Sequence, residues 1–152
     1  MRRAACLLAM LMAFAAEAVH AETHRLDDSL THTVPPNVQM QWRPLQAAAD
    51  GSGAVEAWVQ VNVRLDTRAF VQRSGRVYLA LERDQSSPVE AVWSSQGRLQ
   101  AGRVVSGERT LVFAGVIPGA TLDDQLNMRL RAQTDWHSTQ RRLNFHFQFD
   151  AD

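Results

Sequence analysis

Aromatic side chains on the polar faces of predicted strands are the residues best suited to binding chemistry in this sequence. Trp58 alternates with Glu56 and Gln60, opposite a run of valines, so we expect its indole to face away from the core. An exposed indole can stack on a sugar ring or anchor a protein partner. The alternative is that Trp58 packs beneath the N-terminal leader or a long loop. Trp136, in the polar stretch before the last predicted strand, is a second candidate of the same kind.

Three arginines form a second group of candidate binding residues. Arg129, Arg131 and Arg142 are expected on the outer face of the last pair of strands, with apolar neighbours facing inward. Guanidinium groups in such an array can hold an acidic polysaccharide or a phosphate-bearing surface. The alternative is an ordinary solvated face on which nearby acids pair with the arginines.

The sequence predicts no catalytic residue. It contains neither Gly-x-Ser-x-Gly nor Ser-x-x-Lys, and its 16 basic residues are all arginine, so lysine chemistry has no side chain to use. The single cysteine, Cys6, lies in the segment that we expect to be removed on export. A pair of carboxylates brought together only by the fold remains an alternative. We therefore favour a protein that is not an enzyme and leave the enzyme class open.

No metal or cofactor site is predicted either. The four histidines after the expected cleavage site, His24, His32, His137 and His146, have no His-x-x-x-His spacing among them, and they are interpreted as surface residues. Asp123 and Asp124 lack the Asp-x-Asp-x-Asp-Gly spacing of a calcium loop. With Thr121 as a cap, they are interpreted instead as part of a one-turn helix between two strands.

The N-terminus has the three zones of a secretory signal peptide. Arg2 and Arg3 supply positive charge, residues 4–16 are apolar but too short to span a bilayer, and small residues precede Glu22. We expect cleavage after Ala21, which makes residues 1–21 a signal peptide and places the protein in the periplasm or outside the cell. No transmembrane anchor is then expected in the remaining chain.

The exported chain is expected to be one domain behind a short leader. Residues 22–36 are polar and end in two prolines, which favour extended backbone, so residues 37–152 are assigned to a single domain. Loss of Arg2, Arg3 and Glu17 from the 16 basic and 16 acidic residues leaves 14 against 15. This balance argues against a nucleic-acid partner.

Period-two alternation of apolar residues predicts an all-β domain. The clearest segment runs from Val55 to Leu65, where valines and other apolar residues occupy every second position. Further strands are predicted at 37–43, 76–82, 89–93, 99–105, 109–114, 126–130 and 143–149. About seven or eight strands without a helical period favour an immunoglobulin-like antiparallel β-sandwich, with a small antiparallel barrel as the alternative.

These observations favour an exported binding or structural domain, a component or accessory of a bacterial envelope or surface structure of the pilus or adhesion type. Its partner would be an envelope or surface protein, or a glycan. Two alternatives stay open: a periplasmic hydrolase or carbohydrate-active enzyme, and a small-ligand carrier, which requires a cavity inside the fold.

Overall fold

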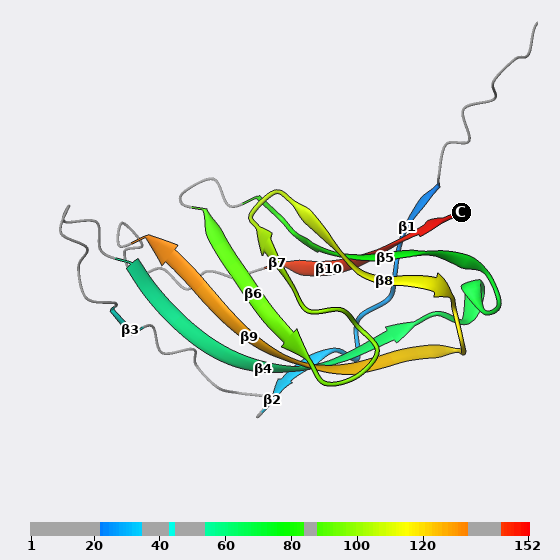
Figure 1. Ribbon diagram of the computed structural model, residues 1–152, viewed down its shortest axis with the longest axis horizontal. Helices are drawn as coiled ribbons and strands as arrows, with labels where there is room; N and C mark the ends of the chain where they lie inside the picture. Colours follow the sequence, from blue (N-terminus) through cyan, green and yellow to red (C-terminus); the bar gives the residue numbers. More distant parts are fainter. Residues whose placement is uncertain (1–21, 35–42, 45–53, 84–87, 134–143) are drawn as a thin grey trace, which may run out of the picture.

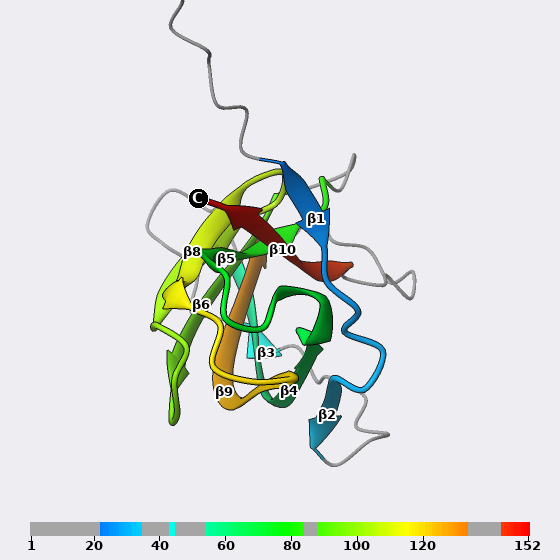
Figure 2. The same ribbon diagram turned by 90° about the vertical axis from the view of Figure 1, so that its right-hand side faces the viewer.

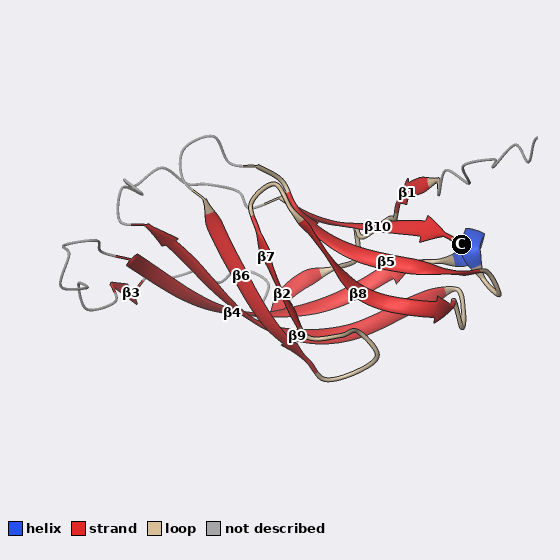
Figure 3. Cartoon of the chain, turned by 45° about the horizontal axis from the view of Figure 1, so that its top comes forward, coloured by secondary structure: helices blue, strands red, loops and turns tan. Residues whose placement is uncertain are grey.

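The computed structural model describes residues 22–34, 43–44, 54–83, 88–133 and 144–152. Within them the chain is almost entirely β-strand, with one short 3-10 helix, η1 (Figure 3). The elements are β1 (Thr23–Arg25), β2 (His32–Val34), β3 (Arg43–Pro44), β4 (Ala54–Asp66), η1 (Arg68–Phe70), β5 (Ser74–Leu81), β6 (Val89–Ser95), β7 (Gly102–Val105), β8 (Arg109–Val116), β9 (Thr121–Gln133) and β10 (Phe145–Ala151).

The strands form two antiparallel sheets packed face to face, which confirms the predicted β-sandwich. The four-stranded sheet has the order β1-β10-β5-β8. The six-stranded sheet has the order β2-β4-β9-β6-β7, and β3 also pairs with β4. Figure 2 shows the two layers from one end. The sheets do not close into the barrel that was the alternative. Two short strands, β1 and β2, take the number above the seven or eight expected.

The core lies between the sheets and is made by the predicted alternation. On β4, Ala57, Val63 and Leu65 are buried, while Glu56 and Trp58 face outward. β5 contributes Val77 and Leu79. Apolar residues of other strands that point between the two sheets complete the same cluster. Burial of these side chains, each worth about 1.5–3 kcal/mol for a large aliphatic residue, is the main stabilising contribution in a domain of this kind.

The last two long strands, for which a common outer face is expected, lie in different sheets. β9 lies between β4 and β6 in the six-stranded sheet, whereas β10 lies between β1 and β5 in the four-stranded sheet. Figure 1 shows β9 and β4 running together along the molecule, with β10 in the opposite layer. Both strands carry an apolar face, and that pattern alone does not say which sheet each joins.

The predicted one-turn helix at Thr121 is wrong, because β9 begins at that residue. Thr121, Asp123 and Asp124 pair with the last residues of β4 instead. The Asp124 carboxylate accepts hydrogen bonds from the Ser95 hydroxyl at 2.8 Å and from the Leu99 backbone N–H at 2.6 Å. Asp124 therefore fixes the loop after β6, although its partners Ser95 and Leu99 are distant from it in sequence.

The segment expected to be an extended leader contributes two short strands. β1 pairs with β10, and β2 pairs with β4, so the chain crosses from one sheet to the other between them. Of the strand predicted at 37–43, only Arg43 lies within the described residues, at the start of β3. The strand predicted at 99–105 begins later, at Gly102.

Candidate functional site

The outer face of the six-stranded sheet brings together three of the predicted binding residues. β4 and β9 pair along their whole length, which places Trp58 opposite Arg129 and Glu56 opposite Arg131. Side chains at facing positions of antiparallel strands lie on the same side of the sheet. Trp58 is 64% exposed, so its indole points into solvent and is not packed beneath the described residues of the leader.

Glu56 holds these side chains in place. Its Oε1 accepts a hydrogen bond from the Trp58 indole Nε1 at 3.0 Å. Its Oε2 lies 3.3 Å from Arg131 Nε and 3.9 Å from Arg129 Nε. The Glu56 side chain is only 14% exposed, so these partners largely shield the carboxylate from water. The guanidinium carbon of Arg129 also lies 5.7 Å from the Trp58 ring centre, within cation–π range.

β6 and β7 extend the same face. Glu90 lies opposite Arg131, and Val92 lies opposite Arg129. Arg103 on β7 pairs with the Glu90 carboxylate, with its NH2 nitrogen 2.7 Å from Oε2. A hollow of about 280 Å³ lies beside Glu90, Arg103 and Arg131. We call the surface formed by Glu56, Trp58, Glu90, Val92, Arg103, Arg129 and Arg131 the Trp58 face.

The Trp58 face contains residue types that are common at recognition surfaces. It combines one exposed indole with three arginines and two glutamates, and tryptophan and arginine are the residues most enriched at binding hot spots. Each glutamate is paired with an arginine, at 3.3 Å for Glu56 and 2.7 Å for Glu90.

The other two predicted binding residues, Trp136 and Arg142, lie outside the described residues. Glu56, Glu90 and Arg103 were missed by the sequence analysis. The signal for Glu56 was present, because it lies two residues before Trp58 on the same face of a strand; Glu90 and Arg103 join only through strand pairing.

A second polar cluster lies on the outer face of the four-stranded sheet. Asp150 is buried, and its carboxylate pairs with Arg109 NH2 at 2.9 Å and accepts the Thr23 hydroxyl hydrogen bond at 2.7 Å. The Arg109 guanidinium carbon lies 4.2 Å from the Tyr78 ring centre. Burial raises the pKa of Asp150, but the hydrogen bonds from Arg109 and Thr23 lower it by more. The pKa of Asp150 therefore lies below its ordinary value.

His146 belongs to the same cluster and is not the surface histidine that was expected. Its side chain is only 13% exposed, and its Nε2 lies 2.9 Å from Gln148 Nε2. The Gln148 amide nitrogen can only donate, so His146 Nε2 is the acceptor in this contact. Gln148 Oε1 in turn accepts from Arg109 NH1 at 3.2 Å. The contacts from Arg109 through Gln148 to His146 therefore link β8 to β10 on the outer face of this sheet, a structural role.

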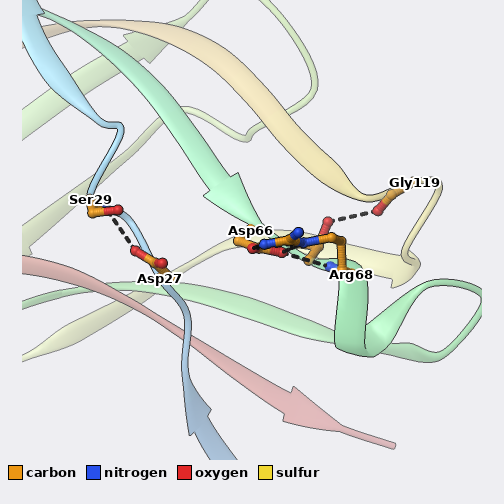
Figure 4. Close-up of polar contacts among 6 residues, drawn as sticks. Asp27, Ser29, Asp66, Arg68 and Gly119 are labelled. Carbon is orange, nitrogen blue, oxygen red and sulfur yellow. Dashed lines mark hydrogen bonds and ion pairs between the residues drawn. The ribbon is translucent and has the colours of Figure 1, made fainter.

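A third polar group ties the end of β4 to the links around it. Hydrogen bonds from the Arg68 side chain and backbone N–H lower the pKa of Asp66 to about 2, and the same pairing raises the pKa of Arg68 (Figure 4). Nearby, the backbone N–H of Ser29 donates to Asp27 and lowers its pKa. The Asp66 backbone N–H donates to the Asp27 carbonyl at 2.9 Å, which joins the β1–β2 link to β4.

Neither a metal-binding group nor a membrane-spanning helix is found in the described part of the chain. No three histidine, cysteine, aspartate or glutamate side chains there are grouped as metal ligands would be. No helix among the described residues has the length and apolar character needed to cross a bilayer. No protein family matches this chain, and comparison with the curated protein sequences and with the solved structures also gives no match.

Proposed function

We propose that this chain is an exported, non-enzymatic binding domain that uses the Trp58 face to hold a partner in the bacterial cell envelope or at the cell surface. The observation that carries the proposal is the 64% exposure of Trp58 on a face where Glu56 and two arginines fix its surroundings. An indole already held in one orientation loses little conformational entropy when a partner covers it. Export is supported by the signal-peptide pattern of residues 1–21.

The charge pattern favours a protein partner from the envelope or surface. Arg103, Arg129 and Arg131 outnumber Glu56 and Glu90, so a partner with one or two carboxylates around an apolar side chain would complement the face. A glycan that stacks on Trp58 would use the same indole and the same arginines. Both partners would fit a component or accessory of a surface structure of the pilus or adhesion type.

The experiment is affinity capture from envelope extracts with three forms of the protein, followed by size-exclusion chromatography of the purified chain. Wild type and Leu30→Ala are expected to retain the same partner, because Leu30 is also 64% exposed but lies outside the Trp58 face. Trp58→Ala is expected to lose it. A strict monomer that retains neither protein nor glycan would overturn the proposal, as would equal retention by Trp58→Ala.

A further inference from the structure

A hollow of about 450 Å³ opens between the two sheets, away from the Trp58 face. It lies where β10 of one sheet faces β2 and β4 of the other, beside the link that carries the chain from β1 to β2. That link is fixed at this point, because the Leu26 backbone N–H donates to the Phe147 carbonyl at 2.9 Å. The hollow therefore has a defined wall on the side where the chain changes sheet.

Apolar side chains form the body of this hollow. Its base consists of core residues that are almost fully buried, among them Leu79 and Leu126. Val59, Val61 and Phe145 line it as well, yet they are only partly buried although they face the interior. Interiors are normally packed without gaps of this size, and an apolar space of this kind favours a hydrocarbon occupant over water.

The polar side chains at the hollow limit the kind of head group that fits. Asp28 is the only acidic or basic side chain, apart from a histidine, among the described residues that line it. Thr33 lies opposite Val61 on β4, on the inward face, and adds a hydroxyl. A carboxylate only accepts hydrogen bonds and repels another negative charge. The complementary head group is therefore a hydrogen-bond donor that is neutral or positive.

We propose that this hollow binds one single-chain aliphatic molecule whose head group is a hydroxyl or an amine. The chain would lie against Val59, Val61 and Phe145, with the head beside Asp28 and Thr33. The volume is within the range of roughly 300–1,000 Å³ that is typical of small-molecule sites. This site is separate from the Trp58 face and does not depend on the function proposed for that face.

The test uses the fluorescence of N-phenyl-1-naphthylamine, a neutral apolar probe, with the purified protein. We expect a saturable increase with one probe bound per chain. Decylamine and decanol should displace the probe at concentrations at least tenfold lower than decanoate, since the three molecules share a chain and differ only in the head. Absence of saturable binding would overturn the proposal, and equal displacement by decanoate would overturn the choice of head group.

Two variants locate the site. Val61→Phe fills the hollow and should weaken probe binding at least tenfold, whereas Val116→Phe makes the same change at an exposed position of β8 that does not line the hollow, and should not. Asp28→Asn should reduce the preference for decylamine over decanoate. Equal binding by wild type and Val61→Phe would place the probe elsewhere and overturn the proposal.

A measurement on the wild-type protein guards against failure of Val61→Phe to fold. Methyl NMR during titration with decanol should shift the signals of Val59, Val61 and Met128, which line the hollow, before those of Val104, which does not. Shifts confined to other methyl groups would contradict the assignment. Analytical ultracentrifugation should show a monomer whose binding does not depend on protein concentration; a dimer that excludes the probe would assign the hollow to a second copy.

Discussion

Trp58 and Arg129 occupy facing positions on β4 and β9, and the Arg129 guanidinium carbon lies 5.7 Å from the centre of the indole ring. The same indole donates its Nε1 hydrogen to Glu56 at 3.0 Å. Glu56 on the same strand and Arg129 on the neighbouring strand thus fix an aromatic ring that remains exposed to solvent. Because the ring is exposed, its removal should cost little stability. Trp58 can therefore be compared with Trp93, the other tryptophan among the described residues of this sheet.

Replacement of Trp93 should cost far more stability than replacement of Trp58. Trp93 is 3% exposed and packs in the core, so Trp93→Ala should lower the free energy of unfolding by about 3–5 kcal/mol. Trp58→Ala removes an exposed ring and a cation–π contact, and should cost at most about 1 kcal/mol. Urea denaturation followed by circular dichroism measures both values. A loss above about 2 kcal/mol for Trp58→Ala would show that the indole is needed for folding.

Arg109→Ala should destabilise the protein more than Arg103→Ala. Arg109 is the ion-pair partner of the buried Asp150 carboxylate, and loss of a hydrogen bond to such a charge costs about 1.5–3 kcal/mol. Arg103 pairs with Glu90 on an exposed face, where such a pair is worth about 0–1 kcal/mol. Thermal and urea unfolding at pH 7 provide the comparison. Equal losses would mean that Asp150 finds another cation when Arg109 is removed.

Acid should remove the stability that two aspartates contribute. The pKa of Asp150 is depressed in the folded state, and that of Asp66 is lowered to about 2, while an unfolded aspartate titrates near about 3.9. A depressed folded pKa contributes stability above the unfolded value, and this contribution is lost as pH falls from about 4 towards 2. The free energy of unfolding should fall steeply over this window, and Asp150→Asn should make the slope shallower. An unchanged slope would contradict the role of Asp150.

The loop after β6 should depend on the space beside Gly97. A Cβ atom there would lie 2.8 Å from an Asp124 carboxylate oxygen, so Gly97→Ala must displace the group that accepts from Ser95 and Leu99. We expect a loss of about 1–3 kcal/mol, the cost of leaving part-buried donors without a partner. Gly119→Ala is the matched control, since a Cβ there would meet nothing within 4 Å. A neutral Gly97→Ala would show that the loop can move aside.

The proposed export predicts where the mature protein begins. Protein recovered from the periplasm or the medium should begin at Glu22, because signal peptidase cleaves after small residues such as Ala21. N-terminal sequencing or intact mass measurement decides this. Full-length protein that begins at Met1 and fractionates with the cytoplasm would contradict it.

The fold class could be predicted from the sequence because alternation is a local property. In the run from Val55 to Leu65, only a period of two places all the apolar residues on one face, and β4 includes the whole run. The outward direction of Trp58 follows from the same run. Strand partners are not local, since β9 and β10 each carry an apolar face that suits either sheet, and this is why the pairing order could not be predicted.

The candidate site could be predicted only in part, for the same reason. Trp58, Arg129 and Arg131 were found from their positions on polar faces. The contact between Glu56 and Trp58 is local, but the ion pairs of Glu56 with Arg129 and Arg131 form only when β9 lies beside β4. Asp124 shows the same limit: its neighbours in sequence resemble a capped turn, whereas its hydrogen-bond partners, Ser95 and Leu99, come from another strand and its loop. Chemistry that depends on long-range pairing leaves little local trace.

The most direct measurement of the central proposal is the affinity of the captured partner for wild type, Trp58→Ala, Arg129→Ala and Leu30→Ala, obtained by isothermal titration calorimetry. A hot-spot residue contributes at least about 2 kcal/mol, so Trp58→Ala should weaken binding roughly 30-fold. Arg129→Ala should also weaken it, and added salt should weaken the wild-type complex, because charge steers the contact. Leu30→Ala should bind as wild type does. Unchanged affinity for Trp58→Ala would contradict the assignment of the Trp58 face as the binding surface.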